Sequence, residues 1–185
     1  MARVVVFNQV SVDGLFCTPD GDVSWAHRHD PEWNDFVAKN AGGGGRLLFG
    51  RVTYEMMVAY WPTPAAAKND PGVAAGMNNL TKIVFSRTLN DVTWKNTTLV
   101  KGELEAEVRK LKKDKGDDIV ILGSGSIVAQ LANARLIDEY QLITVPVVLG
   151  RGRTLFDGVD GPLPLRRVRS RTFENGNVLN GYEPG

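Results

Sequence analysis

The chain has 185 residues, 43% of them hydrophobic and 23% charged, which is typical of a globular domain large enough to bury a core. The 22 Lys and Arg residues against 21 Asp and Glu give a net charge of +1, which argues against a general nucleic-acid binder. The single cysteine, Cys17, excludes an intramolecular disulfide, and no apolar run is long enough to span a membrane. The opening segment also lacks a signal-peptide pattern. We expect one domain over residues 1–185, located in the cytoplasm.

Predicted strands and helices alternate through most of the chain, and strands close it. In chain order, the predicted elements are a strand at 3–12, a helix at 29–40, a strand at 46–50, a helix at 51–61, strands at 81–89 and 97–102, a helix at 103–116, a strand at 117–123, a helix at 127–135, and strands at 137–150, 163–174 and 177–184. The Pro/Ala/Gly-rich stretch 62–79 is expected to be irregular, with room for one short helix. This pattern predicts an α/β sheet that starts parallel and ends in an antiparallel hairpin.

Three local signals refine this pattern. Asp30 is predicted to be the N-cap of the first helix, with Pro31 in its first turn. Pro146 lies inside the last long predicted strand and indicates a bulge or a sheet edge there. The dipeptide Asn175-Gly176 favours the tight turn of a closing hairpin.

A glycine-rich loop lies between an apolar strand and a helix in the stretch IVILGSGSIVAQL, residues 119–131. Such a loop can hold a phosphate on backbone N–H groups at the N-terminus of the helix. It departs from the Rossmann dinucleotide-binding fingerprint, because Val128 stands at the third glycine position and the loop comes late in the chain. A tight strand-to-helix turn without a ligand is the alternative interpretation.

Two further strand ends carry groups suited to anions. In LLFGRVTYE, Gly50 ends an apolar strand, and Arg51 and Thr53 add a charge and a hydroxyl to a helix N-terminus. In IVFSRTL, Ser86 and Arg87 follow apolar residues, and a guanidinium beside a hydroxyl suits a phosphate monoester such as the NADP 2′-phosphate. A solvated arginine at a strand end is the alternative for the second segment.

The order of these segments resembles the dihydrofolate reductase-like superfamily and, within it, the riboflavin-biosynthesis reductase (RibD C-terminal) family. The matching segments span nearly the whole chain and are VSVDG, LLFGRVTYE, VFSRT, IVILGSGSIVAQL, LIDEYQLITVPVVLGRGRTLFDG and SRTFENGNVLNGYEP. The chain is most similar to the small single-domain bacterial members. The resemblance implies a three-layer α/β fold with a mostly parallel central sheet, an antiparallel C-terminal hairpin, helices on both faces, and NADPH lying across the strand ends.

The resemblance also implies which residues hold the cofactor. The residues expected at the cofactor phosphates are Gly50, Arg51 and Thr53, those at the adenosine 2′-phosphate are Ser86 and Arg87, and those beneath the pyrophosphate are Gly123, Ser124, Gly125, Ser126 and Ile127. Related sequences commonly have a second glycine where this chain has Ser124. The serine must therefore adopt the backbone angles of that glycine.

Two acidic residues are the catalytic candidates. The VSVDG match places Asp13 beside the expected nicotinamide and substrate pocket. Glu32, with Phe36 one helical turn later, matches the acidic and aromatic pair that holds the pterin ring in folate-reducing members. Asp35 is a rival for this role, and both helix acids could instead be favourable charges at a helix N-terminus. A carboxyl group or ordered water would deliver the proton to the substrate.

The favoured function is an NADPH-dependent reductase that transfers a hydride to a small heterocyclic substrate, similar to 5-amino-6-(5-phosphoribosylamino)uracil reductase. The alternatives are a dihydrofolate or pterin reductase, a non-catalytic NADP-binding protein that keeps the fold, and an interaction domain. The resemblance implies a homodimer formed through the C-terminal strands. We expect no metal, because the chain lacks the length and ligands of a zinc deaminase domain, and His27 and His29 are interpreted as loop surface.

Overall fold

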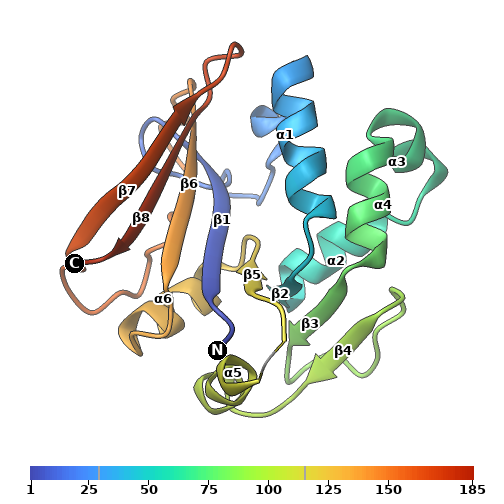
Figure 1. Ribbon diagram of the computed structural model, residues 1–185, viewed down its shortest axis with the longest axis vertical. Helices are drawn as coiled ribbons and strands as arrows, with labels where there is room; N and C mark the ends of the chain where they lie inside the picture. Colours follow the sequence, from blue (N-terminus) through green and yellow to red (C-terminus); the bar gives the residue numbers. More distant parts are fainter. Residues whose placement is uncertain (29, 115) are drawn as a thin grey trace.

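The computed structural model describes residues 1–28, 30–114 and 116–185, and Figure 1 shows how its elements are arranged. The strands are β1 Val4–Ser11, β2 Arg46–Gly50, β3 Thr81–Phe85, β4 Thr97–Val100, β5 Ile119–Ile121, β6 Glu139–Val145, β7 Leu165–Thr172 and β8 Val178–Pro184. The helices are α1 Pro31–Gly42, α2 Arg51–Tyr60, α3 Pro64–Asn69, α4 Pro71–Asn79, α5 Leu104–Lys113 and α6 Gly125–Asn133, with a short 3₁₀ helix at Ser24–Ala26.

Within these residues the strands form one eight-stranded sheet in the order β4-β3-β2-β5-β1-β6-β8-β7. Neighbouring strands from β4 to β6 run parallel, whereas β8 runs antiparallel to β6 and β7 antiparallel to β8. The predicted fold class, a mostly parallel sheet that ends in an antiparallel hairpin, is confirmed. The turn of that hairpin lies at Asn175-Gly176, where Gly176 has a φ of 86°.

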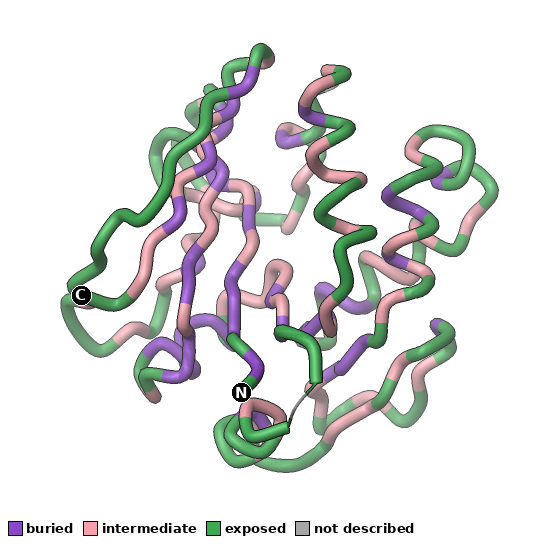
Figure 2. Tube along the Cα trace, in the orientation of Figure 1, coloured by how far each residue is buried: buried purple, intermediate pink, exposed green. Residues whose placement is uncertain are grey.

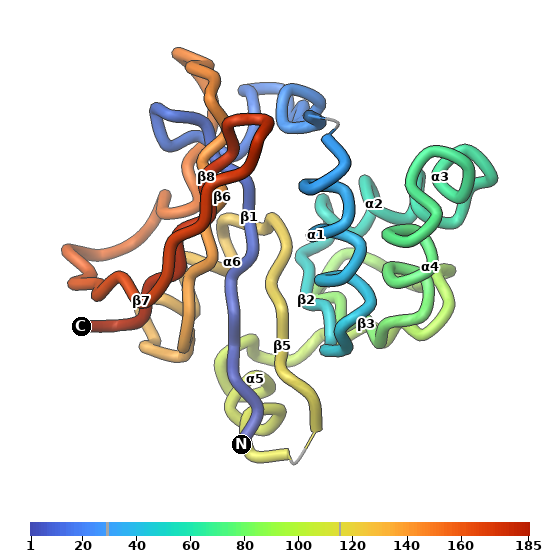
Figure 3. The backbone as a smooth tube through the Cα atoms, turned by 45° about the horizontal axis from the view of Figure 1, so that its top comes forward, coloured from blue at the N-terminus to red at the C-terminus, as the bar shows by residue number. Residues whose placement is uncertain are grey.

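Side chains of the strands build a core on each face of the sheet. Helices α5 and α6 cover one face, where the core contains Val4, Val6, Ile119 and Ile121. Helices α1, α2 and α4 cover the other face and lie together on one side of β1 (Figures 1 and 3). Because successive residues of a strand point to opposite faces, β1 also contributes Phe7 to the second core. Figure 2 shows the resulting buried positions along the central strands.

Two helices, α3 and α4, occupy the stretch 62–79 that the sequence predicts to be irregular, so that prediction is wrong. Each helix has a proline in its first turn, Pro64 in α3 and Pro71 in α4. Proline is compatible with this position because its missing N–H would have no partner there, and its φ is already helical. The Thr63 hydroxyl also caps α3 by accepting a hydrogen bond from the Ala66 N–H at 3.2 Å.

Other element boundaries test the local signals. The Asp30 side chain accepts a hydrogen bond from the Trp33 N–H at 2.9 Å, which confirms the predicted N-cap of α1. Strand β6 ends at Val145, so Pro146 follows the strand instead of forming a bulge within it, because proline cannot donate to the ladder. Helix α6 begins at Gly125, two residues earlier than predicted.

Lys82 is a fully buried charged residue on β3. Its ammonium group donates hydrogen bonds to the carbonyl oxygens of Met77 at 2.8 Å and Leu80 at 2.7 Å, at the C-terminal end of α4. It also lies 4.4 Å from the centre of the Trp94 ring. These carbonyls carry the negative end of the helix dipole, which favours a cation. Loss of hydration nevertheless lowers the pKa of Lys82 from 10.5 to about 8, with a further contribution from the charge of Lys95.

This lowered pKa makes the stability of the protein depend on pH in a defined window. Between about pH 8 and pH 10.5, Lys82 in the folded protein has lost its proton, whereas the unfolded chain still holds it. The unfolding free energy of the wild type, relative to that of Lys82→Met, should therefore rise with pH by on the order of 1 to 3 kcal/mol. Urea denaturation of both proteins from pH 7 to pH 10 measures this difference, and a difference independent of pH would contradict the assignment.

Candidate functional site

Four loops that carry predicted site residues lie at one edge of the sheet. Strands β3, β2, β5 and β1 are consecutive neighbours and run parallel, so their carboxyl ends lie at the same edge. Ser86 follows β3, Gly50 ends β2, Gly123 follows β5, and Asp13 follows β1. The topology therefore brings segments that are far apart in the sequence to one side of the molecule.

The loops after β2 and β5 are in direct contact. The Gly50 N–H donates a hydrogen bond to the Ser124 hydroxyl oxygen at 2.7 Å, and the Ser124 hydroxyl donates to the Thr53 hydroxyl oxygen at 2.9 Å. A Cβ atom at Gly123 would lie only 2.9 Å from the same Thr53 oxygen. Glycine is therefore needed at position 123, and the two predicted phosphate segments form one continuous structure.

The backbone of the loop after β5 is left-handed at two consecutive residues. Gly123 has a φ of 57°, and Ser124 has φ 57° and ψ 60°. Glycine adopts this conformation without a steric cost, whereas the Cβ of a serine makes it unfavourable. Ser124 thus holds a backbone conformation that glycine adopts more easily.

Two helix N-termini open at this contact. Helix α2 begins at Arg51 and α6 at Gly125, with Ser126 and Ile127 in the first turn of α6. The N-cap of α2 is Gly50, which has no side chain, and the Ser124 side chain makes no capping hydrogen bond to α6. A Cβ atom at Gly125 would lie 3.4 Å from the Phe16 ring, so this turn also contacts the loop after β1. Unpaired N–H groups at the positive end of a helix dipole bind anions. The groups present therefore fit the phosphates of a dinucleotide.

Asn8 is a residue of this site that the sequence analysis missed. Its side chain is buried on β1, and its Oδ1 accepts a hydrogen bond from the Gly123 N–H at 2.7 Å. Its Nδ2 has no hydrogen-bond partner among the described residues. The available signal was an amide on the strand face that Asn8 shares with Val4, Val6 and Val10, since a buried polar side chain usually makes a specific hydrogen bond.

Both predicted cofactor arginines are paired with acidic side chains at the surface. Arg51 contacts Glu55 one turn later in α2, at 3.0 Å. Arg87, just after β3, contacts Glu103 at 2.5 Å, and both of these side chains are more than 70% exposed. The Ser86 hydroxyl accepts hydrogen bonds from the N–H groups of the two residues that follow Arg87, at 3.2 and 3.0 Å. Exposed ion pairs of this kind contribute little to stability, so both arginines can exchange partners.

Asp13 lies at the predicted edge, where it holds another loop. Its two carboxylate oxygens accept hydrogen bonds from the N–H groups of Leu149 at 3.1 Å and Gly150 at 2.7 Å. Hydrogen bonds from the Ser11 hydroxyl and from these N–H groups lower the pKa of Asp13 to about 2. The ionised form is therefore strongly favoured, and this arrangement does not favour Asp13 as a proton donor.

Glu32 lies in the first turn of α1 and faces the C-terminal hairpin. Its carboxylate accepts a hydrogen bond from Arg171 of β7 at 2.7 Å, and this contact is the main cause of its lowered pKa. Phe36 lies on the same helix face, as predicted, and the Arg171 guanidinium is 5.4 Å from the centre of its ring. Phe173 lies against both, with its ring centre 5.0 Å from that of Phe36. In the strand order, β8, β6 and β1 lie between β7, which Glu32 contacts, and β5.

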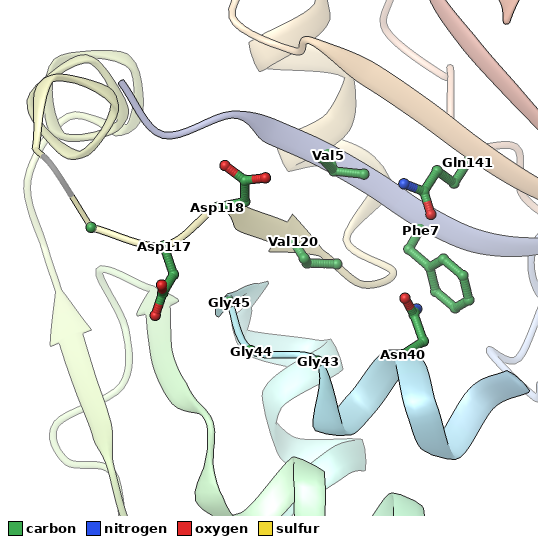
Figure 4. A pocket seen from close by; sticks show the side chains of 11 residues that line it. Val5, Phe7, Asn40, Gly43, Gly44, Gly45, Asp117, Asp118, Val120 and Gln141 are labelled. Atoms are coloured by element: carbon green, nitrogen blue, oxygen red, sulfur yellow. The ribbon is translucent and has the colours of Figure 1, made fainter. Parts of the chain in front are cut away.

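A cavity of about 430 Å³ lies at the opposite end of the sheet (Figure 4). It opens between the C-terminal end of α1 and the start of β5, and Phe7, Asn40 and Gln141 project toward it. No predicted cofactor or catalytic residue lines this cavity. It therefore does not enlarge the site at the carboxyl edge of the strands.

Two further properties of the described residues bear on metal binding and membrane insertion. Residues 1–28, 30–114 and 116–185 contain no group of three or more His, Cys, Asp or Glu side chains that could hold a metal ion. His29, one of the two histidines interpreted as loop surface, lies outside the described residues. Over the same ranges, no helix has the length and apolar character needed to cross a membrane.

Solved structures share this fold over the whole chain. A Shewanella sp. PV-4 protein named for riboflavin biosynthesis superposes with a TM-score of 0.75 at 22% identity, covering 100% of this chain and 99% of that one. The diaminohydroxyphosphoribosylaminopyrimidine deaminase/5-amino-6-(5-phosphoribosylamino)uracil reductase of Thermotoga maritima gives 0.70 at 16% identity, covering 100% of this chain and 57% of the longer protein. Dihydrofolate reductase from Enterococcus faecalis, complexed with NADP(H), gives 0.66 at 17% identity, covering 99% and 96%. The chain therefore has the dihydrofolate reductase-like fold.

Sequence comparison gives the family. The uncharacterized protein YyaP of Bacillus subtilis (strain 168) is 31% identical over 182 residues, which cover 97% of this chain and 94% of the relative. The model of the RibD C-terminal domain matches residues 2–179. With nearly its whole length matched in both comparisons, the chain belongs to the RibD C-terminal domain family.

Proposed function

We propose that the protein is an NADPH-dependent reductase that transfers a hydride to a small heterocyclic substrate. The observation that carries this proposal is the direct contact between the N-termini of α2 and α6, which the hydroxyl groups of Thr53 and Ser124 join. Two adjacent helix N-termini provide the separate N–H groups that a pyrophosphate needs for its two phosphates. The family and its fold neighbours named as reductases support the same activity.

In this proposal each phosphate group of the cofactor is bound by a different set of residues. The Arg51 guanidinium and the Thr53 hydroxyl would bind the pyrophosphate from α2, and the N–H groups of Gly125 and Ser126 would bind it from α6. The Ile127 N–H already donates to the Ser124 carbonyl oxygen at 2.8 Å, so Ile127 would shape this turn. Ser86 and Arg87 would bind the 2′-phosphate, which the Arg87 guanidinium can contact in a bidentate manner. The dihydrofolate reductase of the same fold, in complex with NADP(H), supports this cofactor.

The bound nicotinamide supplies the hydride, and the protein's task is to hold substrate and cofactor in contact and away from water. The lowered pKa values of Asp13 and Glu32 keep both carboxylates ionised at neutral pH. In this proposal both carboxylates therefore act as hydrogen-bond acceptors. Asp13 accepts from the N–H groups of the loop at residues 149–150, and Glu32 accepts from donor groups of the substrate. Ordered water delivers the proton to the acceptor atom of the substrate.

The substrate class follows from the family and from one local arrangement. A pyrimidine such as 5-amino-6-(5-phosphoribosylamino)uracil is the first candidate, because the Thermotoga maritima neighbour is named for the reduction of that compound. A dihydropterin is the second, because Glu32 and Phe36 lie one turn apart on α1 and both contact Arg171, so they share one helix face, as an acidic and aromatic pair for a planar ring would require. Turnover on a panel of both compounds distinguishes them. Binding of NADPH without any turnover would favour a non-catalytic NADP-binding protein.

We further propose that the protein is a cytoplasmic homodimer that pairs through β7. This edge strand is exposed along its whole length (Figure 2). Leu165 and Val168 are among its exposed side chains. An exposed edge strand has unpaired N–H and carbonyl groups that a second strand can satisfy. Light scattering at micromolar concentration should give twice the 20.2 kDa chain mass, and the mass of a monomer would overturn this proposal.

Replacement of Arg87 tests the cofactor assignment. The wild type should bind NADPH more tightly than NADH in calorimetry, since only NADPH carries the 2′-phosphate. Arg87→Ala should weaken NADPH binding about 10- to 100-fold, the range for a charge-assisted hydrogen bond, and leave NADH binding unchanged. Arg109→Ala is the matched control, because Arg109, on α5, is also an exposed arginine paired with a glutamate. Equal wild-type affinities for the two cofactors would contradict the assignment.

Replacement of Glu103 should have the opposite effect. Glu103 holds the Arg87 guanidinium in this structure, so a 2′-phosphate must displace it. Glu103→Gln should tighten NADPH binding by up to about fivefold, the equivalent of an exposed ion pair, without a change in NADH binding. Glu105→Gln removes the same charge from the first turn of α5, the helix that Glu103 precedes as N-cap, and should change neither affinity. A weaker affinity for NADPH in Glu103→Gln would show that Glu103 does not compete with the phosphate.

A further inference from the structure

We infer that the Ser124 hydroxyl is a positioning group that locks the two phosphate-binding loops together before the cofactor binds. This inference rests on the proposed NADPH-dependent function. Its starting point is that one hydroxyl oxygen contacts two groups of the neighbouring loop, the Gly50 N–H at 2.7 Å and the Thr53 hydroxyl at 2.9 Å. A side chain after β5 thus organises the start of the helix after β2.

The Ser124 carbonyl oxygen accepts hydrogen bonds from the start of its own helix, but the Ser124 hydroxyl does not. Ser124 is the N-cap of α6, a position where a serine side chain usually accepts a hydrogen bond from an N–H group of the first turn. Here no such side-chain cap forms, and the hydroxyl reaches across to α2 instead. The serine also holds a left-handed backbone conformation that glycine would adopt more easily. The gain that offsets this conformational cost is therefore the contact between the two loops.

The same contact decides which groups remain for the cofactor. The Gly50 N–H is already bonded to Ser124, so Gly50 shapes the loop and does not itself bind phosphate. The N–H groups of Arg51 to Thr53 in α2 and of Gly125 and Ser126 in α6 stay available, whereas the Ile127 N–H donates to the Ser124 carbonyl oxygen at 2.8 Å. The Thr53 oxygen accepts the Ser124 proton, so the Thr53 hydroxyl keeps its own proton for donation to a phosphate oxygen.

The Asn8 side chain connects a third strand to these hydrogen bonds between the two loops, which together are called the lock below. Its Oδ1 accepts a hydrogen bond from the Gly123 N–H at 2.7 Å, and Gly123 directly precedes Ser124. The ends of β1, β5 and β2 are therefore joined by consecutive hydrogen bonds. Loops that are ordered before binding lose less conformational freedom when the ligand arrives, and this raises affinity. The lock thus favours binding of the pyrophosphate common to NADPH and NADH.

Two variants of Ser124 separate this role from a general effect on stability. Ser124→Ala removes the hydroxyl and keeps the Cβ in the left-handed region, whereas Ser124→Gly removes the hydroxyl and relieves the strain. Both should weaken NADPH and NADH binding alike, about tenfold, as expected for the loss of a hydrogen bond to a pre-ordered loop. Ser124→Gly should have the higher melting temperature of the two variants.

Thr63→Ala is the control variant, because the Thr63 hydroxyl caps α3 and contacts no phosphate segment. It should lower the melting temperature and leave both cofactor affinities unchanged. Isothermal titration calorimetry and thermal melting of the four proteins provide the readouts. If the wild type binds NADPH and both Ser124 variants bind it equally well, the lock is wrong and the proposed function stands. If the wild type binds neither dinucleotide, the proposed function fails and the inference fails with it.

Discussion

Hydrogen bonds between the ends of three parallel strands hold the candidate site together. Asn8 on β1 accepts from Gly123 after β5, and the Ser124 hydroxyl next to it joins Gly50 and Thr53 after β2. This chain of contacts requires adjacent parallel strands, because only then do the loops of different βα units emerge side by side. It also requires glycine at position 123, where the Thr53 hydroxyl leaves no room for a Cβ atom. The sheet topology and the loop chemistry therefore depend on each other.

Charge at this edge is balanced within the protein itself. Arg87 pairs with Glu103, Arg51 pairs with Glu55, and the carboxylates of Asp13 and Glu32 accept hydrogen bonds that lower their pKa values. A phosphate ligand would exchange one anionic partner for another at the arginines. Such an exchange costs little because the pairs are exposed, and it gains affinity because a phosphate can bind a guanidinium in a bidentate manner. The backbone N–H groups at the start of the two helices have no anionic partner that a phosphate would have to displace.

Hydrophobic periodicity and turn residues predicted most of the fold, and these local signals agree with the structure wherever packing does not override them. The strand at residues 3–12 and the Asn175-Gly176 turn are examples. The Pro/Ala/Gly-rich stretch 62–79 was expected to be irregular with room for one short helix, whereas it forms the two helices 64–69 and 71–79, each of which begins at a proline. Strand-end motifs identified Gly50, Thr53 and Ser124, but their mutual contact and the role of Asn8 depend on strand order, which no local pattern contains.

The central claim is that the N-termini of α2 and α6 bind one cofactor together. A titration of ¹⁵N-labelled protein with NADPH, followed by the backbone amide resonances, tests it most directly. The amides of Arg51 to Thr53 and of Gly125 to Ile127 should shift together and give one dissociation constant. Shifts confined to one of the two segments, or centred on the cavity near Asn40 and Gln141, would contradict the claim.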